Sequence, residues 1–72
     1  MAYQSVHVKY NYNYSQWCVN IEHEAMPRSH RSTKGAAEQV GRGLAALMKT
    51  ELIVHDHDGT VSARTSYASD SL

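Results

Sequence analysis

Histidine and aspartate alternate in the segment ELIVHDHDG, residues 51–59, directly after an apolar run. Imidazole nitrogens and carboxylate oxygens bind zinc, and the same groups act as general acids and bases. On a strand, His55 and His57 would lie about 7 Å apart on one face, so both could reach one metal ion. A zinc site needs further ligands at tetrahedral positions, and the chain offers His7 and Cys18 for that role.

The same segment also has the pattern of a β-hairpin, with its aspartates as turn residues. Asp58-Gly59 between alternating apolar residues is typical of a hairpin, because both residue types tolerate the positive φ of a type I′ turn. A two-residue turn there would place His55 and His57 on one face of the sheet. Four apolar side chains would then point to the other face, toward a helix: Leu52, Val54, Val61 and Ala63. We therefore interpret the segment chiefly as a hairpin.

The composition indicates one small soluble domain, spanning residues 1–72. A chain of this length buries only about 60% of its unfolded surface, so its core is thin. Seven basic residues balance seven acidic ones, so no overall charge draws the chain to nucleic acid or an acidic membrane. One cysteine excludes an internal disulfide, and no signal peptide or membrane span is evident. We expect a cytoplasmic protein without membrane contact, ordered over residues 4–67, with a frayed tail at 68–72.

Two segments near the N-terminus, residues 6–10 and 17–21, alternate apolar and polar residues with the period of half-buried strands. Turn-forming residues separate them, which predicts an antiparallel hairpin. With a helix and the second hairpin, the order along the chain is strand, strand, helix, strand, strand. We predict an α+β fold in which one helix packs on one face of a four-stranded antiparallel sheet.

The polar segment 23–32 contains the one proline and predicts a loop between sheet and helix. Ser32 or Thr33 can cap the helix, because a side-chain oxygen there accepts from the free amides of the first turn. Gly41 and Gly43 flank the apolar stripe of this helix, and they either let it lie close to the sheet or form a contact between two copies. The stripe consists of Ala37, Val40, Leu44, Leu47 and Met48.

The face of the sheet away from the helix is predicted to be open and polar. Domains that read single-stranded RNA carry stacking aromatic rings on such a face, and here the central residues are histidine, asparagine and isoleucine. A second copy could close this face instead and form a homodimer. The face is expected to carry His7, Lys9, His55, His57 and Arg64, with Cys18, Asn20 and Ser62 beside them.

The open face offers no evident catalytic constellation. Cys18 with a histidine could act as nucleophile and base, but a strand interior in a small open sheet provides no cleft. A lone cysteine there is typically a small apolar filler. We expect no enzymatic activity, no bound metal and no cofactor.

Two other segments are candidates for partner binding. A basic loop lies at the predicted helix start, where free amides and the helix dipole favour anions such as phosphate or an acidic protein patch. Exposed tyrosines at the tip of the first hairpin are typical of protein interfaces and can also stack on bases. The alternatives are a solvated basic loop and ordinary strand-end aromatics. The residues concerned are Arg28, His30, Arg31 and Lys34 in the loop, and Tyr12 and Tyr14 at the tip.

Several short motifs resemble, in residue type and separation, those of the small bacterial and phage proteins of domain-of-unknown-function family 2188. They are Trp17-Cys18-Val19, Thr33 with Ala37 in a helix, ELIVH followed by Asp58-Gly59, and Ser66-Tyr67. The resemblance covers about residues 15–68. It implies a fold rather than an activity, and it makes His55, Asp58, Gly59, Ser66 and Tyr67 framework positions.

Four residues depart from the pattern of that family. Asp56 stands where the family usually has glycine, and Ala68 stands where glycine commonly follows the serine-tyrosine pair. His30 and Arg31 stand where the family usually has one or two apolar residues.

The leading functional hypothesis is a small non-enzymatic interaction module. It would be a regulator or inhibitor, encoded by a phage or prophage, that binds a host protein complex of the transcription or defence machinery. The alternative is a nucleic-acid-binding domain that uses the basic loop and the tyrosine-rich hairpin. Steep loss of affinity with salt would distinguish phosphate contacts from a mostly apolar protein interface.

Overall fold

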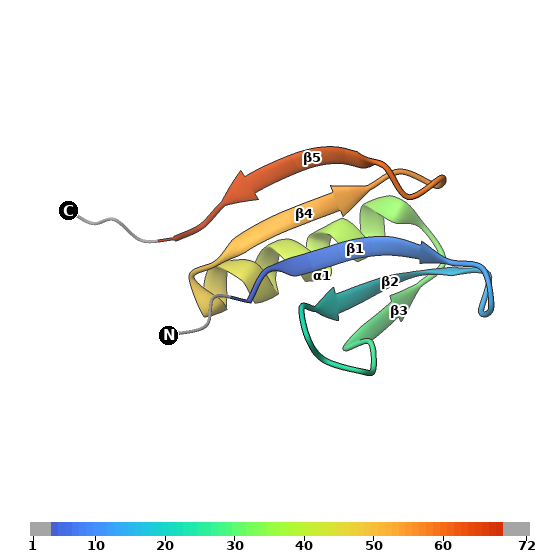
Figure 1. The fold of residues 1–72 in the computed structure, drawn as a ribbon, viewed down its shortest axis with the longest axis horizontal. Coiled ribbons are helices and arrows are strands. Elements are labelled where there is room, and N and C mark those ends of the chain that lie inside the picture. The colour runs from blue at the N-terminus through green and yellow to red at the C-terminus, as the bar shows by residue number, and fades with distance from the viewer. Residues whose placement is uncertain (1–3, 69–72) are drawn as a thin grey trace.

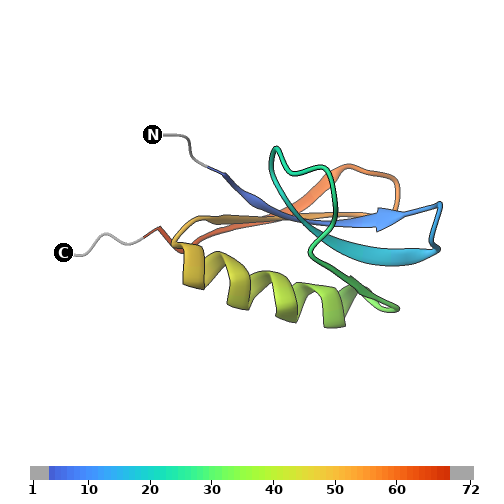
Figure 2. The same cartoon turned by 90° about the horizontal axis from the view of Figure 1, so that it is seen from below.

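A mixed five-stranded sheet with one helix on one face forms the architecture of the computed structural model, which describes residues 4–68 (Figures 1 and 2). The strands lie in the order β3-β2-β1-β4-β5 across the sheet. The predicted α+β class with a single helix is confirmed. The elements are β1 (Val6–Asn11), β2 (Gln16–Ile21), β3 (Ser29–Arg31), α1 (Lys34–Met48), β4 (Glu51–His55) and β5 (Val61–Ser66).

The predicted sheet of four antiparallel strands was wrong in two respects. First, β3 adds a fifth strand that pairs antiparallel with β2 within the segment expected to be a loop. A strand of three residues is too short to show an alternating pattern, so backbone pairing alone defines it. Second, β4 pairs with β1 in parallel, because α1 carries the chain back across the sheet between them. Side-chain alternation is the same for both pairing directions and cannot distinguish them.

A capping residue defines each end of the helix. Thr33 is the N-cap, and its Oγ1 accepts a hydrogen bond from the amide of Ala36 at 3.2 Å, which agrees with the predicted start. At the other end Lys49 adopts the left-handed conformation, with φ of 55°. The amide of Thr50 then donates to the carbonyl of Ala45 at 3.0 Å, which satisfies a carbonyl that the helix leaves free.

The helix approaches the sheet through a row of small residues. Ala37, Gly41 and Ala45 are buried and lie at intervals of four along one face of α1. A Cβ atom on Gly41 would lie 2.9 Å from methyl carbons of both Leu52 and Val8, so the glycine permits the close approach. Of the two alternatives given for the glycines, close approach of the helix to the sheet therefore holds for Gly41. A Cβ on Gly43 would meet nothing within 4 Å.

The predicted stripe of the helix was wrong at one position. Leu47 is 80% exposed, because the small-residue row, rather than the larger side chains, faces the sheet. Three other stripe residues are partly buried against the core: Val40, Leu44 and Met48. The core beneath the helix consists of Val6, Val8, Trp17, Val19, Ile21, Leu52 and Val54, in line with the predicted alternation.

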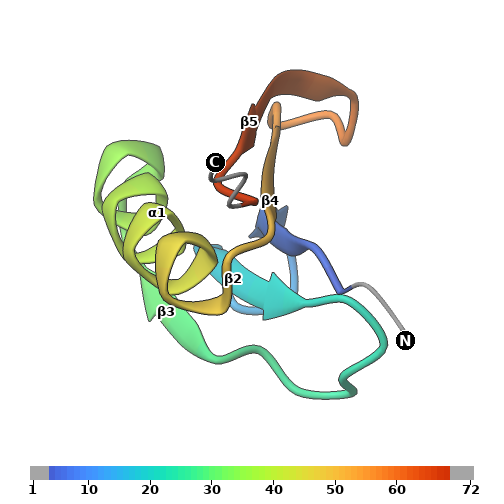
Figure 3. The same ribbon diagram turned by 90° about the vertical axis from the view of Figure 1, so that its left-hand side faces the viewer.

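The helix covers the sheet unevenly. It packs against β1, β2, β3 and β4, whereas β5 projects beyond it (Figure 3). All six residues of β5 are exposed. Val61 was predicted to face the helix but pairs with His55, because the ladder shifts by one residue at a bulge between Val54 and His55.

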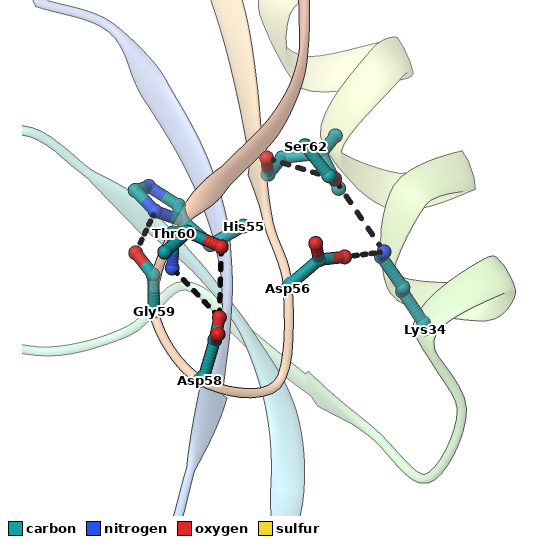
Figure 4. Close-up of polar contacts among 8 residues, drawn as sticks. Lys34, His55, Asp56, Asp58, Gly59, Thr60 and Ser62 are labelled. Carbon is teal, nitrogen blue, oxygen red and sulfur yellow. Dashed lines mark hydrogen bonds and ion pairs between the residues drawn. The ribbon is translucent and has the colours of Figure 1, made fainter.

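The β4–β5 connection is a three-residue loop rather than the predicted two-residue type I′ turn. The amide of Asp56 donates to the carbonyl of Thr60 at 2.7 Å, so the loop consists of residues 57–59. Within it Gly59 alone has a positive φ, of 94°, as in hairpins that end with a glycine bulge. The Asp58 carboxylate accepts from the amide and the hydroxyl of Thr60 at 3.1 and 2.8 Å, which stabilises the longer loop (Figure 4).

Candidate interaction site

Four aromatic side chains contact one another where β1 ends and β2 begins, and Tyr14 lies on the turn between these strands. We call this group of five the aromatic end: Tyr10, Tyr12, Tyr14, Trp17 and His57. Tyr10 lies at its centre, with its ring 3.9 Å from the ring of His57 in a stacked arrangement and 5.3 Å from the ring of Trp17 edge to face. Trp17 is buried and Tyr10 is half-buried, so the base of the group is part of the core.

The two outer tyrosines are exposed but held in place. Tyr12 is 67% exposed, and its hydroxyl donates to the carbonyl of His57 at 2.7 Å. Tyr14 is 57% exposed, and its ring lies 5.1 Å from the ring of His30 on β3. The Asn11 side chain accepts from the amides of residues 13 and 14, which fixes the turn that carries both tyrosines. The β1–β2 turn therefore presents its rings from an ordered backbone.

The structure places His57 in the aromatic end, and its predicted position on the open face beside His55 was wrong. The three-residue loop turns the chain after Asp56, so His57 stacks on Tyr10 instead of continuing the alternation of β4. The sequence did not predict the contact between His57 and Tyr10, because the conformation of the loop, rather than residue spacing, determines it.

The predicted basic loop is largely neutralised by carboxylates. Arg28 forms two hydrogen bonds with Glu24, at 2.8 and 3.0 Å, and this guanidinium lowers the pKa of the Glu24 carboxyl. Lys34 pairs with Asp56 at 3.0 Å (Figure 4). Its Nζ also lies 5.7 Å from the centre of the Trp17 ring. Arg31 donates to the carbonyl of His30 and has no carboxylate partner within residues 4–68.

The open face carries a hydrogen-bonded pair of histidines. His7 Nδ1 lies 2.9 Å from His55 Nε2, and His55 Nδ1 lies 3.1 Å from the carbonyl oxygen of Gly59. A carbonyl can only accept, so neutral His55 carries its hydrogen on Nδ1 and accepts from His7 through Nε2. Burial, followed by the neighbouring His55, lowers the pKa of His7.

The other residues of the open face occupy separate positions on it. Lys9 is exposed, and Arg64 pairs with Glu51 at 3.3 Å. Cys18 lies between Lys9 and His30 on neighbouring strands and is 1% exposed; burial raises the pKa of its thiol. No group of three or more His, Cys, Asp or Glu side chains in the described part of the chain is arranged to hold a metal ion.

A shallow hollow of about 180 Å³ opens where β1 and the β4–β5 loop separate. Its walls combine both regions: Lys9 and His55 from the open face, Tyr10, Tyr12 and His57 from the aromatic end, and loop residues 56, 58 and 59. Its carboxylates are already engaged, Asp56 by Lys34 and Asp58 by Thr60. Neither carboxylate is therefore a free base, and the other ionisable or aromatic groups of the hollow are the side chains of Lys9, Tyr10, Tyr12, His55 and His57.

A family model matches most of the chain. The sequence model of a family described as "Uncharacterized protein conserved in bacteria (DUF2188)" matches residues 6–67. No curated protein and no solved structure matches the chain. Within residues 4–68, α1 lacks the length and apolar character that crossing a membrane requires.

Proposed function

The chain belongs to DUF2188, a bacterial family without a characterised activity, and we propose that it is a non-enzymatic protein-binding module whose contact surface is the aromatic end. The proposed role is that of a small regulator or inhibitor, phage- or prophage-encoded, acting on a host transcription or defence complex. The single observation that carries the protein-binding proposal is the pair of exposed tyrosines held on an ordered turn.

Tyrosine and arginine dominate the binding energy of many protein interfaces. Large exposed rings that are already fixed lose little conformational entropy on binding, so more of the contact energy appears as affinity. Tyr12 is fixed by its bond to the His57 carbonyl, and Tyr14 by the ordered turn and by His30. The guanidinium of Arg31 adds a charge that a partner carboxylate can pair with.

The alternative of nucleic-acid binding has less support from the same surface. Non-specific binding to a nucleic acid depends on several lysines and arginines that neutralise phosphates. In this region Arg28 and Lys34 are paired with Glu24 and Asp56, so the local charge is close to balanced. A protein surface of mixed polarity therefore fits the aromatic end better than a phosphate backbone does.

Affinity purification from the native host, with the tagged chain as bait, tests the proposal. The variant Tyr14→Ala with Arg31→Ala removes one ring and the free charge, while Tyr12 keeps its bond to the loop. Leu47→Ala is the matched control, because it removes an exposed apolar side chain from α1. We expect a partner protein to be retained by the wild type and by the control, and lost with the double variant.

Equal recovery with all three baits would contradict the proposal. Titration with single- and double-stranded oligonucleotides at two salt concentrations tests the alternative separately. Binding that is tight at low salt and falls steeply with added salt would favour the nucleic-acid reading instead.

A further inference from the structure

The edge strand β5 is open on three sides. It pairs with β4, and apart from the 3.5 Å contact between Lys34 and Ser62 the helix does not approach it (Figure 3). Both of its faces and its outer backbone edge are therefore accessible in the described chain. An unpaired edge presents a row of backbone donors and acceptors on which another strand can pair.

The two edges of the sheet differ in how well they are protected. The opposite edge, β3, has three residues and follows Pro27 closely. Short strands and proline are common means of preventing edge pairing. In contrast, β5 has six residues without proline or glycine, and its one charge, Arg64, is balanced by Glu51. The long edge thus remains competent to pair.

The backbone groups that face outward on β5 follow from its ladder with β4. The amide of Tyr67 donates to the carbonyl of Thr50, so residues 50 and 67 form a hydrogen-bonded pair. Bonded and non-bonded pairs alternate in an antiparallel ladder, which makes Leu52–Thr65 the next bonded pair. The amides and carbonyls of Arg64 and Ser66 consequently point away from β4, toward the free edge.

We propose that a second copy of this chain occupies that edge, with the two β5 strands antiparallel, so that two five-stranded sheets form one continuous sheet. The edge matches a copy of itself, because its outward amides and carbonyls, on Arg64 and Ser66, lie evenly about Thr65, and charge does not oppose the pairing. The formal net charge of the chain is zero, so two copies do not repel each other at long range. The edge itself is neutral as well, because Arg64 is paired within its own chain.

One register uses the outward groups of both copies. A twofold axis at Thr65 places Arg64 of each copy opposite Ser66 of the other, and both are bonded pairs made from the free amides and carbonyls. Thr65 then faces its own counterpart, and cross-strand threonine pairs are favourable. The two arginines do not face each other, which avoids like charges in directly opposite positions.

The test changes the charge at the axis. Thr65→Arg and Thr65→Glu each place like charges opposite each other in the dimer, whereas an exposed side chain at this position is tolerated in one copy. Sedimentation equilibrium should give a dimer for the wild type and for the control Thr65→Val. For each charged variant alone, the dissociation constant of the dimer should rise by about tenfold or more. An equimolar mixture of the two variants should recover the dimer.

Hydrogen exchange supplies an independent readout at the backbone. The amides of Arg64 and Ser66 should exchange quickly in dilute protein and slowly at concentrations where the dimer forms. The amide of Thr65, bonded to β4 in either state, should change less. These residues are separate from the aromatic end, so this experiment does not depend on the proposed function.

Three results would overturn the proposal. A wild type that is monomeric up to about 1 mM would exclude a useful edge contact. A dimer that persists in both charged variants would place the contact on another surface. A mixture that fails to recover the dimer, although Thr65→Val retains it, would exclude the twofold axis at Thr65.

Discussion

Replacing Gly41 by alanine places a methyl group between α1 and the sheet. The new Cβ would lie 2.9 Å from Cδ1 of Leu52 and from Cγ2 of Val8, closer than carbon atoms pack without displacement. Both neighbours are buried, with exposures of 2% and 0%, so neither side chain can turn away into solvent. Either the helix moves outward or the two side chains leave their preferred rotamers.

A matched variant separates the packing cost of the added methyl group from the intrinsic preference of a helix for alanine over glycine. Alanine is favoured over glycine in a helix interior by about 1 kcal/mol. Added volume in a packed core costs about 1–3 kcal/mol. Gly41→Ala therefore combines a gain with a larger or equal loss, while Gly43→Ala has the gain alone, since its Cβ meets nothing within 4 Å. The free energies of unfolding of the two variants should differ by about 1–3 kcal/mol.

Urea unfolding followed by fluorescence measures this difference. Trp17 is the one tryptophan and is buried in the core, so its emission reports the loss of tertiary structure. In thermal unfolding, 1 kcal/mol corresponds to a shift of about 4–8 °C for a domain of this size. We expect Gly43→Ala to melt at least about 4 °C above Gly41→Ala, and above the wild type.

A double-mutant cycle identifies the atoms responsible. Val8→Ala removes one of the two opposing methyl carbons, so Gly41→Ala should cost less in that background than in the wild type. If Gly41→Ala proves as stable as Gly43→Ala, the close approach of helix and sheet does not constrain the fold, and the reasoning is refuted. A cost that is unchanged by Val8→Ala would exclude Val8 as its source.

Three further predictions concern the cap, pH and the cysteine. Thr33→Ala should lower the free energy of unfolding by about 1 kcal/mol, measured in urea, because the Ala36 amide loses its acceptor; Thr33→Ser should retain most of it. The lowered pKa of His7 means that the unfolded chain binds its proton more readily, so stability should fall as pH drops below 6.5 and remain steady above it. Unfolding midpoints between pH 5 and 8, compared with those of His7→Gln, check this; an identical slope in the variant would exclude His7 as the cause. Cys18, buried and with a raised pKa, should react with a thiol reagent far more slowly when folded than in urea, and equal rates would contradict its burial.

The candidate site was only partly predictable. Tyr12, Tyr14, His30 and Arg31 were singled out by residue type, and the structure brings the Tyr14 and His30 rings together. Their meeting depends on β3, which places His30 next to Cys18 on the neighbouring strand. The carboxylate that pairs with Lys34 could not be assigned from the sequence either, because Asp56 lies 22 residues away along the chain.

Local features of the sequence determined which segments become strands and helix. Alternation at Val6, Val8 and Tyr10, the Thr33 cap and the apolar spacing after it depend on neighbours within a few residues, so their effect can be read directly. These features also determined that one face of the sheet is apolar and that a helix covers it.

The tertiary structure alone decided how those elements meet. Parallel pairing of β1 with β4, the strand at 29–31 and the position of His57 on Tyr10 all depend on contacts between distant segments. Side-chain periodicity is a property of one strand, whereas pairing direction, register and loop form are settled by backbone hydrogen bonds between strands. The helix rests on its small residues because Gly41 lets it approach Val8 and Leu52, and β5 lies beyond the strands that the helix covers.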